Sequence, residues 1–173
     1  MFTTNYWTYK SYIESQNIDG GGAAWRWIDI GLKGLNGATV QFQQYRSDVM
    51  AYNYGVIAYC GVRSALSIVV GTGTSAPSMD DYALGSDVTS SFSNMACSYT
   101  TGANDATVKT VITLTGTNST GSPITITEYG VTKGVPSGNQ VTTPVLFIHD
   151  ILPAPIVVLP KCGFTLTIEW VDA

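Results

Sequence analysis

The C-terminal stretch constrains the fold most, because apolar and polar residues alternate there without interruption from Phe164 to Val171. One face would carry Phe164, Leu166, Ile168 and Trp170, and the other Thr165, Thr167 and Glu169. A period of two is typical of a β-strand that buries one face and leaves the other in solvent. Such a strand requires an antiparallel sheet packed against a second layer.

Similar apolar segments recur along the chain, separated by turn-forming residues. Residues 107–115 and 124–131 flank the turn cluster GTNSTGSP, so we expect these two strands to pair antiparallel. Residues 24–32 and 38–45 flank Leu35-Asn36-Gly37 and predict a hairpin. Residues 49–70 predict two strands, the second of which would point Leu66, Ile68 and Val70 inward.

Two short apolar runs, 145–151 and 156–159, surround the sequence LPAP. Because Pro153 and Pro155 cannot donate ladder hydrogen bonds, we expect an edge crossing or a strand switch there. Many short strands with frequent turn signals and almost no helix predict an all-β fold, an antiparallel β-sandwich of the jelly-roll or immunoglobulin-like type. A chain of 173 residues fits one such domain, which we place at residues 23–173.

Residues 1–22 show little periodicity and are predicted to form an extended N-terminal arm. The arm has few aliphatic residues but carries Tyr6, Trp7, Tyr9 and Tyr12. Tyrosine and tryptophan are enriched at protein contacts, and terminal segments are commonly ordered by a partner. We therefore predict that these four aromatic residues bind a neighbouring subunit.

Composition excludes several classes of partner. Charged residues make up only 12% of the chain, against about 25% in an ordinary soluble domain. The net charge is −4 and no basic cluster occurs, so we expect neither nucleic-acid nor membrane binding. The N-terminus lacks the pattern of a signal peptide, so we expect folding in a reducing cytoplasm. Cys60, Cys97 and Cys162 are interpreted as small buried residues, with one disulfide as the alternative.

The segment from Val69 to Val88, VVGTGTSAPSMDDYALGSDV, looks at first like a phosphate-binding loop followed by a pair of carboxylates. No lysine lies between Arg63 and Lys109, so the loop cannot be of the P-loop type. We interpret the segment as a connector in which Ser78 and Asp81 form a capping box that starts one helical turn at residues 79–84. That turn would place Met79, Tyr82 and Leu84 on the sandwich as a lid. A calcium site at Asp80, Asp81 and Asp87 is the alternative, without the dense acidic spacing of known loops.

The residue types needed for catalysis are sparse. His149 is the only histidine, and its neighbour Asp150 would point to the opposite face of a strand. No G-x-S-x-G motif occurs, so we predict neither a catalytic nor a cofactor site and expect His149 to satisfy a nearby polar partner. Glu128 either faces inward, with Lys109 or Lys133 as its partner, or faces solvent.

Three segments resemble tailed-bacteriophage virion structural proteins. They are VGTGTSAPSMDDYALGS, ITITEYGV and LFIHDILPAPIVVLPKCGFTLTIEW, and together they span about residues 69–170. His149 stands where the resemblance expects an arginine. The resemblance implies a β-sandwich protein located in the virion.

We therefore expect a non-enzymatic virion structural protein without a metal or cofactor, most simply a capsid auxiliary, decoration or head-fibre subunit. Its partners would be other virion proteins and further copies of the same chain. A tail or baseplate subunit is the first alternative. A carbohydrate-binding module for host attachment, which would use exposed tryptophan or tyrosine, is the second.

Overall fold

The computed structural model describes residues 1–15, 26–28, 31–40, 42–44, 66–104, 107–136 and 142–172. Within these ranges, one α-helix, α1 (Thr4–Ser15), precedes eight strands and a short 3₁₀ turn, η2 (Thr89–Ser91). The strands are β1 (Arg26–Ile28), β2 (Phe42–Gln44), β3 (Leu66–Gly71), β4 (Phe92–Asn104), β5 (Thr107–Asn118), β6 (Ile124–Pro136), β7 (Thr142–Val158) and β8 (Gly163–Asp172).

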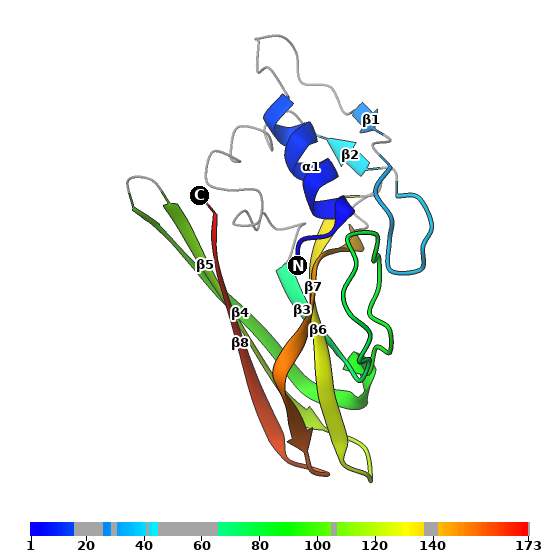
Figure 1. The fold of residues 1–173 in the computed structure, drawn as a ribbon, viewed down its shortest axis with the longest axis vertical. Coiled ribbons are helices and arrows are strands. Elements are labelled where there is room, and N and C mark those ends of the chain that lie inside the picture. The colour runs from blue at the N-terminus through cyan, green and yellow to red at the C-terminus, as the bar shows by residue number, and fades with distance from the viewer. Residues whose placement is uncertain are drawn as a thin grey trace.

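The long strands form two antiparallel three-stranded sheets, with the orders β3-β6-β7 and β4-β5-β8. The predicted all-β, sandwich-like fold is therefore confirmed. Figure 1 shows the two sheets as long ribbons that approach each other at the lower end of the view, with α1 at the upper end. A separate small ribbon pairs β1 with β2, which confirms the hairpin expected around Asn36.

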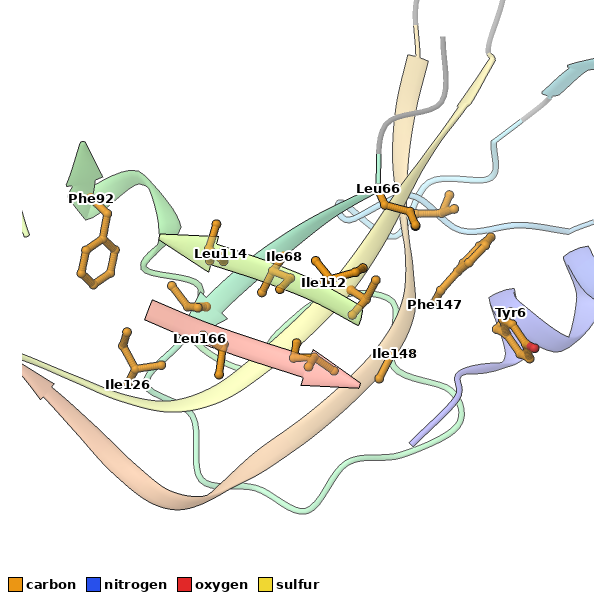
Figure 2. Packing of buried hydrophobic residues seen from close by; sticks show 14 of the residues in the cluster. Tyr6, Leu66, Ile68, Phe92, Ile112, Leu114, Ile126, Phe147, Ile148 and Leu166 are labelled. Atoms are coloured by element: carbon orange, nitrogen blue, oxygen red, sulfur yellow. The ribbon is translucent and has the colours of Figure 1, made fainter. Parts of the chain in front are cut away.

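The core lies between the two sheets, and the alternating residues supply it. Leu66, Ile68 and Val70 of β3 are buried as predicted. On β8, the residues Phe164, Leu166 and Ile168 are buried, while Thr165, Thr167 and Glu169 are exposed. Figure 2 shows Ile68, Ile112, Leu114 and Leu166 gathered between the ribbons of β3, β5 and β8. Period two therefore identified the buried faces of β3 and of residues 164–169 of β8 correctly, whereas residues 145–149 of β7 are buried without alternation. The side chain of Trp170 lies outside the described residues.

The predicted pairing of residues 107–115 with 124–131 is wrong. β5 pairs with β4 and β8, whereas β6 pairs with β3 and β7, so residues 119–123 carry the chain from one sheet to the other. The buried Asn118 side chain directs this crossing by donating to the carbonyls of Ser122 (2.8 Å) and Val158 (2.9 Å). Burial also removes Asn118 from the surface, although Asn118-Ser119-Thr120 matches a glycosylation motif.

β7 is one continuous edge strand rather than two short ones. Its register against β6 shifts between the pairs Ile126↔Ile156 and Glu128↔Ile151. Pro153 and Pro155 lie within this irregularity, where no ladder donor is required. In place of the predicted edge crossing or strand switch, the prolines lie in a bulge within one strand at the edge of its sheet.

The N-terminus corrects the expectation of an extended arm. Residues 1–3 run antiparallel along β7, with the His149 amide donating to the Met1 carbonyl (3.0 Å) and the Thr3 amide to the Phe147 carbonyl (2.9 Å). α1 follows, and Tyr6 and Tyr9 are buried with Phe147 in the core. Packing against β7 stabilises a helix that the polar and aromatic sequence alone does not indicate. The division between residues 1–22 and 23–173 stays a prediction.

Two cysteines also differ from expectation, because Cys97 on β4 and Cys162 in the turn before β8 are exposed. Cys60 and the first strand expected in residues 49–70 lie outside the described residues. No helix in the described ranges is long and apolar enough to cross a membrane.

Candidate functional site

A buried carboxylate, Glu128, is the most unusual polar group of the fold. It lies on β6 with 1% of its side chain exposed. Gly73 and Ser86 each donate a backbone N–H to Oε1 at 2.8 Å, and Gly85 donates to Oε2 at 3.2 Å. Donors from both ends of one connector therefore converge on a single side chain.

We call residues 72–88 the strap. Its two ends are joined to each other and to β3, since the Thr72 amide donates to the Ser86 carbonyl and the Val88 amide to the Val70 carbonyl, both at 2.9 Å. The Thr127 hydroxyl also donates to the Gly73 carbonyl at 2.7 Å. The strap thus leaves β3, folds over β6 and returns to η2.

The glycines of the strap region make room for Glu128. A Cβ at Gly73 would lie 2.7 Å from Glu128 Cδ, and a Cβ at Gly71 would lie 2.7 Å from Glu128 Cγ. Real Cβ atoms essentially never approach other heavy atoms so closely. Gly71 and Gly73 are therefore required for close approach to a carboxylate of the chain itself, which is a sharper reason than the turn freedom that sequence suggests.

His149 completes the cluster from β7. Its Nε2 lies 2.9 Å from Glu128 Oε2, and its Nδ1 lies 2.6 Å from Asp81 Oδ2. Glu128 and His149 are diagonal neighbours on adjacent strands, because Gly130 pairs with His149 and Glu128 pairs with Ile151. We call Asp81, His149 and Glu128 the acid–histidine cluster.

The electrostatics of Glu128 reflect two opposing effects. Burial raises the pKa of this carboxyl, but the amides of Ser86 and Gly73, the His149 ring and the Gly85 amide lower it. The hydrogen bonds outweigh burial, so the pKa lies below its ordinary value. The predicted partner Lys133 lies instead over the Tyr9 ring, 5.5 Å from its centroid. The side chain of Lys109, the other predicted partner, lies outside the described residues.

The strap forms no helical turn beyond Ser78, which corrects the prediction for residues 79–84. Part of the capping box is present, because the Ser78 amide donates to Asp81 Oδ2 at 2.7 Å. However, the Ser78 hydroxyl accepts from the Asp80 amide instead of the Asp81 amide. The Asp81 amide donates to the Ser78 carbonyl at 3.2 Å, so the chain makes one hydrogen-bonded turn there and no helical turn follows.

The three acids of the alternative calcium site have separate partners. Asp81 bonds His149, Asp80 accepts from the Thr4 hydroxyl at 3.4 Å, and Asp87 accepts from the Thr89 amide at 2.7 Å. Within the described ranges, no group of three or more acidic, histidine or cysteine side chains is arranged to hold a metal ion.

Exposed apolar side chains occur on two segments that touch each other, the N-terminal segment and the strap. Six large apolar side chains in the described residues are exposed, and four of them, Met1, Trp7, Met79 and Tyr82, lie on the N-terminal segment or the strap. The two segments touch, because the Thr4 amide donates to the Met79 carbonyl. We call these four residues the apolar patch. Beside it, Met79 and Tyr82 line a hollow of about 180 Å³ together with Asn5, Lys33, Asp80 and Asp81.

The four predicted partner-binding aromatics divide between core and surface. Tyr6 and Tyr9 are each only 1% exposed, whereas Trp7 is 46% exposed. Tyr12 belongs to α1, but its side chain lies outside the described residues. Of the strap, Met79 and Tyr82 are exposed and do not form the lid that the sequence predicted.

Comparison of the chain with protein-family models, with curated proteins and with solved structures found no match in any of the three.

Proposed function

We propose that this protein is a non-enzymatic structural subunit of a bacteriophage virion, a capsid auxiliary, decoration or head-fibre protein. It attaches to other virion proteins through the apolar patch. The resemblance of residues 69–170 to virion proteins supports the location, and the patch supports the mode of attachment.

The clustering of exposed apolar side chains carries this proposal. Isolated exposed apolar residues are ordinary, but a group of them marks a contact surface. Trp7 and Tyr82 are of the residue types that contribute most to protein interfaces, and Met79 adapts to irregular surfaces. The side chains of the acid–histidine cluster are engaged in hydrogen bonds within the protein, which fits a structural role for the cluster.

Co-sedimentation tests this assignment on particles of the phage that encodes the chain, assembled without it. The wild-type protein should bind stoichiometrically, and the double variant Trp7→Ser, Tyr82→Ser should lose binding. The matched control is Val157→Ser, Leu159→Ser, which removes exposed apolar side chains from the other end of β7. If the double variant binds as well as the wild-type protein, the apolar patch is not the attachment surface. If the wild-type protein does not bind at all, the assignment as a capsid auxiliary, decoration or head-fibre protein is wrong.

Two alternative functions are each supported by a specific observation. A tail or baseplate subunit would use the same patch, and binding to tails but not to heads identifies it. A carbohydrate-binding module is favoured by the hollow, because Tyr82 stands beside Asn5, Asp80 and Asp81, and sugars are bound by aromatic faces and polar groups. Retention on immobilised host glycans, lost in Tyr82→Ala, would identify that function.

A further inference from the structure

We propose that the acid–histidine cluster is a proton-operated latch. While His149 is positively charged, it holds the strap to the sheet through Asp81 and Glu128, and loss of one ring proton releases the Asp81 side of the strap. The latch is independent of any particular function for the protein.

The first step concerns the bond between His149 and Glu128. Each carboxylate oxygen of Glu128 faces two nitrogens: Oε1 faces the Gly73 and Ser86 amides, and Oε2 faces the Gly85 amide and His149 Nε2. An ionised carboxylate offers about four acceptor sites and no donor. The three amides and the His149 ring together hold the pKa of Glu128 below its ordinary value, so the carboxyl is ionised and can only accept. Nε2 therefore carries the hydrogen that completes the set.

The second step concerns Nδ1. Asp81 Oδ2 accepts from the Ser78 amide at 2.7 Å and also lies 2.6 Å from Nδ1. One proton must therefore sit between Nδ1 and Asp81. Because a carboxylic acid is ordinarily a stronger acid than an imidazolium, the proton belongs to the ring. Both ring nitrogens then donate, and His149 is a cation between two carboxylates.

The third step identifies which side opens. If the ring loses one proton, one carboxylate faces a bare nitrogen lone pair and is repelled. Glu128 is fixed by three backbone amides and is 1% exposed, whereas the Asp81 side chain is 28% exposed and accepts one other bond. Asp81 therefore moves into solvent, together with the strap segment that carries Met79 and Tyr82.

Other charged groups near His149 come from every element that surrounds it. Asp150, its neighbour on β7, bonds the amino group of Met1 at 2.9 Å. Asp80 and Lys33 border the hollow on the strap and N-terminal sides. On β6, burial and then Asp150 raise the pKa of Tyr129, so this phenol stays neutral when the latch opens. Protonation of Glu128 in acid would also weaken the latch, so the latch is closed over an intermediate range of pH.

Nuclear magnetic resonance of the ¹⁵N-labelled full chain tests the latch directly, because the sequence contains a single histidine. At neutral pH, both ring nitrogens of His149 should show the protonated chemical shift. As the pH rises, the amide signals of Asp81 and Tyr82 should shift with the same midpoint as the ring, while those of Gly73 and Ser86 stay. A neutral single tautomer at pH 7, or strap signals that ignore the ring titration, would overturn the proposal.

Two variants sharpen the test. His149→Arg carries a permanent charge and should keep the Asp81 and Tyr82 signals at their closed positions throughout the alkaline range. Asp81→Ala removes the acceptor of Nδ1 and should place Tyr82 at its open position already at neutral pH, with Gly73 and Ser86 unchanged. If His149→Arg folds and its Tyr82 signal still depends on pH as in the wild-type protein, the latch is contradicted. If that variant does not fold, the titration of the wild-type protein alone decides whether the latch exists.

Discussion

At the residue scale, Glu128 shows how a buried charge is compensated. An isolated carboxylate inside a protein is strongly disfavoured, but Glu128 receives three backbone N–H bonds and one from His149. From the sequence, an inward and an outward orientation of the Glu128 side chain were equally plausible, and lysines were the predicted partners. The amide donors could not be predicted, because Gly73, Gly85 and Ser86 are distant from Glu128 in the sequence.

Glu128→Gln replaces one accepting oxygen with a donor and leaves two N–H groups without an acceptor. We expect a loss of about 1–3 kcal/mol in the free energy of unfolding, the usual cost of unsatisfied buried groups. Urea denaturation measures it. Thr165→Ser, on the exposed face of β8, is the control and should change stability by less than about 0.5 kcal/mol. Equal effects of the two substitutions would contradict the buried network.

The lowered pKa of Glu128 also predicts how stability depends on pH. Because the folded state favours the charged form, its contribution is fully present above the ordinary value of 4.5 and is lost as the pH falls through the folded-state pKa. Wild-type stability should therefore drop on acidification more steeply than that of Glu128→Gln. Denaturation series at several acidic pH values compare the two, and parallel profiles would show that Glu128 is not responsible.

At the element scale, the strap and the inter-sheet crossing are the parts that local patterns misjudged. Ser78 and Asp81 have capping-box spacing, yet Asp81 serves His149 across the fold. Residues 119–123 have the composition of a hairpin turn, yet Asn118 bonds the Val158 carbonyl and directs the chain to the other sheet. Period two identifies buried faces because alternation is local, whereas sheet partners depend on contacts distant in sequence.

Gly73→Ala should destabilise the protein through contact with the Glu128 carboxylate. We expect a cost of about 1–3 kcal/mol, typical of overpacking. Gly121→Ala is the control, since nothing lies within 4 Å of its Cβ. In a double-mutant cycle, Gly73→Ala should cost less in a Glu128→Ala background, because the clashing atoms are gone. Additive effects would mean that the two residues do not meet.

At the scale of the whole molecule, the N-terminal helix is joined to the core of the sandwich by its buried tyrosines. Around the start of α1, aromatic residues divide between a core that holds the helix and a patch that faces solvent. The sequence indicated the importance of these aromatics but not the division, because residues 1–15 lack a clear apolar stripe. Helix formation here depends on packing against Phe147 of β7.

Tyr9→Ala and Trp7→Ala should therefore behave differently. Tyr9→Ala empties a buried site and should cost about 3–5 kcal/mol, as other large core truncations do. Trp7→Ala should cost much less, because Trp7 is about half exposed. Thermal and chemical unfolding distinguish them. A Trp7 effect as large as that of Tyr9 would place Trp7 in the core and remove it from the proposed contact surface.

The central claim is that the strap, which resembles a catalytic loop, is structural and is held by Glu128. Hydrogen exchange of the Gly73, Gly85 and Ser86 amides tests this most directly, because each donates to that one carboxylate. In the wild-type protein all three amides should exchange slowly, although they lie in an irregular segment outside the sheets, and in Glu128→Ala all three should exchange faster together. Fast exchange of these amides in the wild-type protein would contradict the account.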